Sequence, residues 1–141
     1  MSLELRVTNV HVNDDHVPAL DFEILLRINA EFVLRAHGVD VFREGEFPFI
    51  EFASQLAAWL RAGGVENFDY ESMDSDVVGF VYFHRRDDGR WDAGSMLPGY
   101  EAAIVTNDDV RQATKAFLAA VPALVEVFGR DVLRFVESEI A

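Results

Sequence analysis

The chain has 141 residues, half of them hydrophobic, and its 25 acidic and 12 basic side chains give a net charge of −13 at pH 7. This charge argues strongly against DNA, RNA or an anionic membrane as a partner, because phosphate binding draws its affinity from Lys and Arg. Twelve Phe and a regular apolar periodicity exclude a disordered chain, and the length suits a single domain, residues 1–141.

Cysteine is absent, so disulfides, thiol catalysis and Cys-ligated zinc are excluded. The N-terminal residues carry charges at Glu4 and Arg6 and no apolar run of signal-peptide length. The longest apolar stretches fall short of the roughly 20 residues that a membrane span needs. We therefore expect a cytoplasmic protein.

The first half of the chain begins with strand patterns. Residues 3–7 alternate between apolar and charged, and from Leu20 to Leu34 apolar residues occupy every even position, which predicts a long half-buried strand. At about 3.3 Å per residue this strand would approach ~50 Å, so we expect a bend or bulge near Asn29-Ala30. Gly38 then offers a turn, and residues 39–42 form a return strand.

After Gly45 the period changes to that of a helix. Apolar residues from Phe49 to Leu60 recur at helical spacing, with Pro48 at the start and Gly63-Gly64 at the end. Strands are predicted again at 68–71 and 77–84. Asp88-Gly89 suggests a type I′ hairpin turn, with a return strand over 91–95.

The last third is helical. Thr106 and Asp109 form a capping-box variant at the start of a helix. Pro122 predicts a kink or a division into two helices, because proline lacks an N–H and clashes with the preceding turn. Gly129 ends this segment, and residues 132–140 suggest a short final helix. The order of elements predicts an α+β fold: an antiparallel or mixed sheet of about five to six strands, with a central helix and C-terminal helices packed mainly on one face.

The sequence contains none of the common catalytic motifs. There is no GxSxG elbow, no GxxxxGK[ST] loop and no GxGxxG fingerprint. His11 and His16 flank an Asn-Asp-Asp turn, but their spacing matches no recurrent metal signature, so we predict no metal and no cofactor. His84 ends an apolar strand and is more typical of an edge histidine than of a general base.

One acidic stretch stands out. Residues 66–76 hold five acids and no base, interleaved with Phe68, Tyr70 and Met73. Aromatic anchors in a field of one sign are typical of an interface for a cationic protein. The same letters also fit an acidic strand whose Phe68 and Tyr70 point into the core. The candidate partner-binding residues are Glu66, Asp69, Glu71, Asp74 and Asp76, together with Asp14 and Asp15.

Three segments carry a family resemblance: E-F-P-F-I-E-F-A-S-Q-L-A-A-W-L at 46–60, F-D-Y-E-S at 68–72 and W-D-A-G-S at 91–95. Over about residues 20 to 138 the chain resembles small bacterial proteins of the immunity class associated with polymorphic toxins. The resemblance implies an α+β protein that binds a cognate toxin domain and blocks it, often a nuclease with a basic groove. Trp59 and Trp91 are better explained as core residues than as contacts with such a partner.

The functional hypothesis is a non-enzymatic, immunity-like module whose acidic surface neutralises a basic toxin domain. One alternative is a structural or regulatory domain that self-associates through a sheet edge or a helix face. Another is a small-molecule binder or hydrolase that uses His84 and nearby carboxylates, which would require a deep polar pocket.

Overall fold

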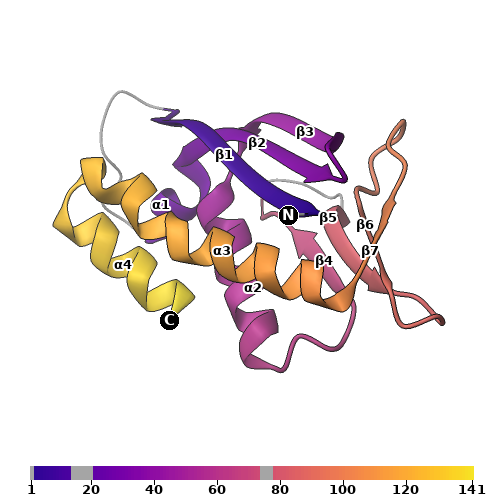
Figure 1. The fold of residues 1–141 in the computed structure, drawn as a ribbon. Coiled ribbons are helices and arrows are strands. Elements are labelled where there is room, and N and C mark those ends of the chain that lie inside the picture. Colours follow the sequence, from indigo (N-terminus) through magenta and orange to yellow (C-terminus); the bar gives the residue numbers. More distant parts are fainter. Residues whose placement is uncertain (1, 14–20, 74–77) are drawn as a thin grey trace.

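The computed structural model describes residues 2–13, 21–73 and 78–141. Figure 1 shows the chain as a pair of sheets with helices packed beside them. The elements in chain order are β1 (Leu3–Val12), α1 (Asp21–Arg27), β2 (Ile28–Ala36), β3 (Val39–Phe47), α2 (Phe49–Arg61), β4 (Phe68–Glu71), β5 (Val78–Arg85), β6 (Trp91–Gly94), β7 (Ala103–Val105), α3 (Asn107–Val125), a 3-10 turn (Glu126–Phe128) and α4 (Arg130–Ile140).

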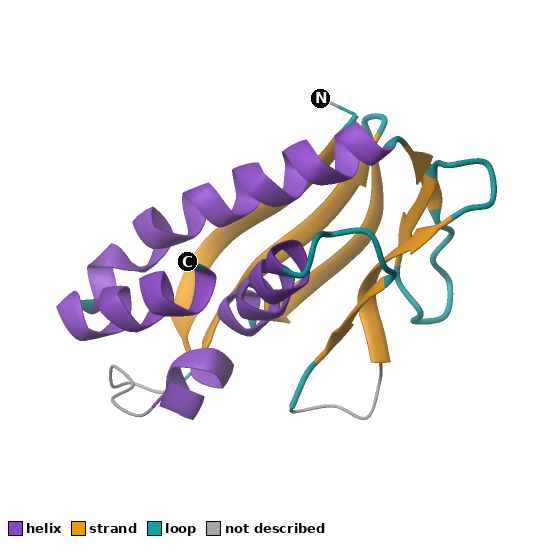
Figure 2. Cartoon of the chain, turned by 90° about the horizontal axis from the view of Figure 1, so that it is seen from below, coloured by secondary structure: helices purple, strands orange, loops and turns teal. Residues whose placement is uncertain are grey.

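The predicted α+β class is confirmed. In place of one antiparallel or mixed sheet of about five to six strands, the described residues form seven strands in two antiparallel sheets. In the described residues, one sheet has the order β1-β2-β3 and the other β4-β5-β6-β7. Figure 2 shows helices lying across one face of the three-stranded sheet. Helix α2 contacts both β2 and β4, and α3 runs along β1, so α2 is the central helix that the sequence predicts.

Phe52 on α2 joins the layers of the core. Its ring centroid lies 5.3 Å from Phe47 in the first sheet, 5.3 Å from Tyr70 in the second and 5.4 Å from Phe117 on α3. The contacts with Phe47 and Tyr70 are edge to face, and contacts of this kind add about 0.5–1.5 kcal/mol each to the free energy of burial. The sheets and helices therefore share one hydrophobic core.

Both tryptophans belong to this core, as predicted. Trp91 is buried, and half-buried Trp59 packs against it edge to face with 5.9 Å between ring centroids. The indole N–H of Trp59 donates to the carbonyl oxygen of Glu66 at 2.9 Å. This contact ties the end of α2 to the turn that leads into β4.

Glu51, in the first turn of α2, is a buried acidic residue with two defined donors. Its carboxylate accepts a hydrogen bond from the Tyr70 hydroxyl at 2.6 Å and from the backbone N–H of Met73 at 3.0 Å. A buried carboxylate is tolerated only when it is hydrogen-bonded. The pair of bonds therefore fixes the end of β4 against α2.

The long strand predicted from Leu20 to Leu34 is wrong in its first half, because Asp21–Arg27 is the helix α1. Leu25, an apolar residue at an odd position, already breaks the alternation. Glu23 and Arg27 lie four residues apart and form an ion pair at 3.4 Å. This spacing brings the two side chains together on a helix, where the pair is stabilising, but keeps them apart along a strand. The predicted irregularity near Asn29-Ala30 is found as a register shift between Ala30 and Phe32.

The hairpin at Asp88-Gly89 is real, but its turn is not type I′. Gly89 has a φ of +86°, whereas Asp88 has no positive φ. Hydrogen bonds from Gly89 N to Arg86 O and from Arg86 N to Arg90 O describe a three-residue loop with a bulge at the glycine. One left-handed residue is enough for this loop, so the dipeptide predicts the hairpin correctly and its geometry incorrectly.

Helix α3 begins as predicted and the helical segment ends at Gly129 as predicted, but Pro122 does not divide it into two helices. Thr106 and Asp109 form the capping box, with bonds of 3.1 and 3.0 Å. The helix continues through Pro122 to Val125, and the chain leaves helical geometry only at Gly129. Within the described ranges, no helix combines the length and apolarity that crossing a membrane requires.

We predict that Tyr70→Phe lowers the free energy of unfolding by about 1–3 kcal/mol, because it leaves a buried carboxylate oxygen of Glu51 without its hydroxyl donor. Urea denaturation followed by circular dichroism measures this. Tyr100→Phe is the matched control: that hydroxyl is exposed and makes only a 3.4 Å bond to a backbone carbonyl. Equal effects of the two substitutions would contradict the role given to Glu51.

Candidate protein-binding face

Strand β4 sorts its side chains by alternation. Phe68 and Tyr70 are buried, and Asp69 and Glu71 between them are exposed. Phe68 and Tyr70 are therefore core residues, as the alternative interpretation of the sequence holds, and they cannot be the aromatic anchors of an interface. The outward face of β4 keeps its two carboxylates.

Gly79 on β5 brings an apolar side chain next to these acids. It has a φ of +84°, and a Cβ at this position would lie 2.6 Å from Cγ of Met96 and 3.2 Å from Oδ1 of Asp69. Met96 and Asp69 thus converge over a glycine that no larger residue can replace without displacing them. The backbone N–H of Met96 also donates to the Gly79 carbonyl at 2.8 Å.

Large apolar side chains are exposed along this edge of the second sheet. The exposed fractions are 62% for Met73, 50% for Val78 and 59% for Met96. Val78 pairs directly with Glu71 in the β4–β5 ladder. We call this surface the β4 face; its residues are Glu66, Asp69, Glu71, Met73, Val78 and Met96.

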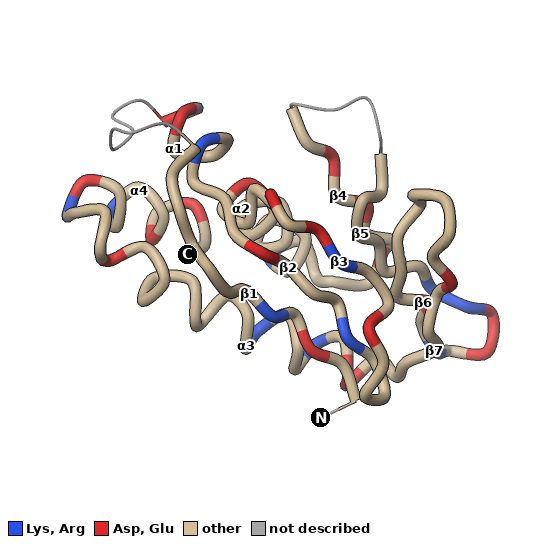
Figure 3. The backbone as a smooth tube through the Cα atoms, turned by 90° about the horizontal axis from the view of Figure 1, so that it is seen from above, with Lys and Arg blue, Asp and Glu red and all other residues tan. Residues whose placement is uncertain are grey.

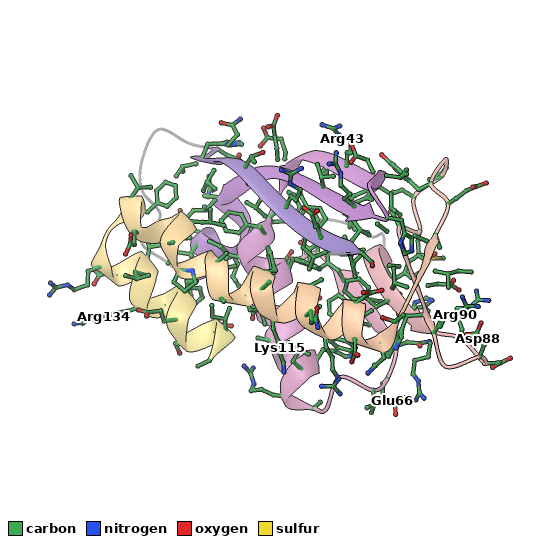
Figure 4. All side chains as sticks on the ribbon, in the orientation of Figure 1. Arg43, Glu66, Asp88, Arg90, Lys115 and Arg134 are labelled. Carbon is green, nitrogen blue, oxygen red and sulfur yellow. The ribbon has the colours of Figure 1, made fainter. Side chains whose placement is uncertain are left out.

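The structure brings together three of the seven predicted partner-binding residues. Asp69 and Glu71 lie on β4, and Glu66 precedes it and points into solvent (Figure 4). The other four predicted residues, Asp14, Asp15, Asp74 and Asp76, lie outside the described residues, as does His16.

Acidic residues are spread over both sheets and the helices (Figure 3). Several of those that lie away from β4 form ion pairs with arginines. Asp40 contacts Arg35 at 2.8 Å and Arg43 at 2.9 Å, and the hydrogen bond from Arg35 is the main reason that the pKa of Asp40 falls below its ordinary value. Similar ion pairs join Glu4 to Arg6 and Glu23 to Arg27.

The acidic residue Asp88 in the β5–β6 hairpin is also paired with arginines. The backbone N–H of Arg90, followed by the guanidinium groups of Arg90 and Arg86, lowers the pKa of Asp88 to about 2. Figure 4 shows Asp88 and Arg90 together at the tip of this hairpin. Among the described residues, by contrast, no Lys or Arg forms an ion pair with Glu66, Asp69 or Glu71.

Asp69 has a histidine partner, His84, whose Nε2 lies 2.8 Å from Oδ1 of Asp69. The ring of Tyr82 lies 4.2 Å from that of His84, and burial, with smaller contributions from Asp92 and Asp69, raises the pKa of Tyr82. The group resembles a catalytic dyad, and His84 does not line any of four surface pockets whose walls the described residues form.

No three His, Asp or Glu side chains among the described residues are arranged to hold a metal ion. His11 instead contacts Glu46, with Nε2 at 2.8 Å from the carboxylate, and its Nδ1 lies 2.7 Å from the Asn9 carbonyl oxygen. Both ring nitrogens of a protonated His11 therefore have acceptors.

Comparison with known proteins identifies the family. Residues 8–127 match the model of a domain of unknown function, DUF7878. The chain belongs to the DUF7878 family. It matches no curated protein and no solved structure.

In this DUF7878 chain two residues of the β4 face, Val78 and Met96, are not among those predicted from the sequence. A glycine within the apolar run 77–84 is the signal that could have indicated them, because glycine inside a strand marks a bulge or a close approach by another group. The register shift between Asp69 and Glu71 and the contact of Met96 with Gly79 are the features that it marks.

The pKa of His11 is raised above its ordinary value of 6.5, first by the Asn9 carbonyl and then by Glu46. Protonated His11 therefore stabilises the fold below about pH 6.5, and this stabilisation is lost as the pH rises through the folded-state pKa. We predict that Glu46→Gln lowers the His11 pKa without abolishing the rise, because the Asn9 carbonyl remains. An NMR titration of the imidazole protons measures the change, with Glu101→Gln as a distant control. An unchanged pKa in Glu46→Gln would contradict the assignment.

Proposed function

We propose that this protein is a non-enzymatic binding module that docks a basic protein domain on its β4 face. The observation that carries the proposal is the combination at β4: carboxylates without an arginine or lysine partner stand beside three exposed apolar side chains. A cationic partner would compensate the charge and cover the apolar area in one contact.

Charge and apolar area have separate parts in such a complex. Unpaired surface carboxylates raise the rate of encounter with a positively charged protein, in a way that salt screens. Apolar side chains that become fully desolvated set the dissociation rate, because most differences in affinity among related complexes lie there. Methionine suits the second part, since its flexible thioether adapts to the surface that it meets.

The resemblance to the immunity class of polymorphic-toxin systems supplies a kind of partner. In that class a small α+β protein covers a toxin domain, often a nuclease with a basic groove for nucleic acid. Applied to this chain, the β4 face would occlude such a groove. The net charge of −13 supports a basic partner over a nucleic acid for the same surface.

The test reverses the charge of the β4 face. Glu66→Lys with Glu71→Lys should slow association with the partner by about 10-fold or more at low salt and flatten its salt dependence. Glu66 and Glu71 are both exposed, so the fold should be retained. The partner is sought by capture on immobilised protein, and a basic protein encoded by a neighbouring gene is the first candidate; stopped-flow kinetics then gives the rates.

The control variant Glu101→Lys with Glu137→Lys makes the same change in net charge at exposed positions on a loop and on α4. It should retain the partner and most of the association rate. If the two double variants behave alike, the β4 face is not the docking surface.

A second test addresses the apolar part. Met73→Ser with Met96→Ser should raise the dissociation rate by about 10-fold and change the association rate little, because apolar anchors act after encounter. Val127→Ser is the matched control, since Val127 is 82% exposed on the 3-10 turn before α4. Loss of association rate without faster dissociation would contradict the division between charge and apolar contact.

A further inference from the structure

A cavity of about 510 Å³ lies between the two sheets, away from the outward side of β4. Its walls come from the α1–β2 junction, the end of β3 and the strands β4 and β5. The volume falls within the range of about 300–1,000 Å³ that is usual for small-ligand sites.

Two polar side chains that line this cavity, Asn29 and Tyr70, already have hydrogen-bond partners. The Asn29 amide donates to the Leu26 carbonyl at 3.0 Å, and the Tyr70 hydroxyl donates to Glu51. In the described part of the chain no buried side-chain nitrogen or oxygen lacks a hydrogen-bond partner. Half-buried Leu26, Pro48 and Phe80 supply the apolar part of the accessible wall, beside the polar residues Asn13 and Ser72.

Two acidic residues, Glu44 and Glu46, line the same cavity. Glu44 accepts a hydrogen bond from the backbone N–H of Glu46 at 3.1 Å, and Glu46, with 64% of its side chain exposed, contacts His11. Among the described residues neither carboxylate has a Lys or Arg partner. Arg43, the adjacent arginine, is held by Asp40 at 2.9 Å.

We propose that this cavity binds an alkylammonium ion, with the apolar stem against Leu26, Pro48 and Phe80 and the charged end at Glu44 and Glu46. Ligands of this kind bury an alkyl chain along an apolar wall while the cation stays near water and a counter-charge. Phe80 adds a ring face, which attracts cations. An anion would meet two acidic residues and, among the described lining residues, no Lys or Arg, so the site favours a cation.

The test uses n-butylamine, with butan-1-ol as a neutral probe of similar shape. At pH 7.5 butylamine should shift the amide resonances of the cavity residues in NMR titrations and bind at least ~10-fold more tightly than butanol. Glu44→Gln with Glu46→Gln should weaken butylamine binding by about 10-fold and leave butanol unchanged. Glu101→Gln with Glu137→Gln is the matched control and should bind butylamine as the unmodified chain does.

Equal binding of the two probes, unchanged butylamine binding in the Glu44/Glu46 double variant, or no shift at 50 mM butylamine would each overturn the proposal. Two further probes identify the source of the cation. Binding of an acetylated Gly-Lys-Gly amide peptide would point to a lysine side chain of a protein, and binding of spermidine without the peptide would point to a free amine.

This proposal is independent of docking at the β4 face. Glu66→Lys with Glu71→Lys should leave butylamine binding unchanged, because neither residue lines the cavity. The binding experiments with butylamine and those with a protein partner can therefore each fail while the other succeeds.

Discussion

The hydrogen bonds of the buried Glu51 carboxylate are the interaction on which the arrangement of the molecule depends. Glu51 lies at the start of the central helix and holds both the Tyr70 hydroxyl and the backbone that follows β4. Phe52, the next residue, contacts aromatic rings from both sheets. One turn of α2 therefore combines a polar link, which is specific in direction, with apolar contacts that supply most of the burial energy. The outward side of β4 is presented to solvent because its inward side is held in this way.

The sequence predicts a helix or strand correctly where the local residue pattern fits only one type of secondary structure. The stripe from Phe49 to Leu60, the Thr106 capping box and the alternation of β4 each fit a single local structure, and all three are found. The strand predicted over residues 21–27 is wrong because four of these seven positions are apolar, a pattern that fits a strand or a helix. The helix that forms there packs against α2. The division into two sheets depends on long-range packing that no local pattern contains.

The acidic residues of the β4 face could be predicted from the sequence, whereas the apolar side chains that lie beside them could not. Glu66, Asp69 and Glu71 are visible as an acidic run, and the alternation around Tyr70 places two of them outward. Met96 lies 27 residues from Asp69 in sequence and reaches it only because Gly79 leaves room. The ion pairs at Asp40 and Asp88, which distinguish neutralised acids from free ones, are likewise properties of folded geometry.

The choice of side chains over Gly79 also determines how the molecule would respond to oxidants. Met73 and Met96 are each more than half exposed as residues, and exposed methionines are open to oxidation to the sulfoxide. A sulfoxide is polar and hydrated. Oxidation would therefore leave the carboxylates of β4 in place and make the neighbouring methionine side chains polar. Reductases that restore methionine would reverse the change. Chemical repair could thus return this surface to its original character without new synthesis of the chain.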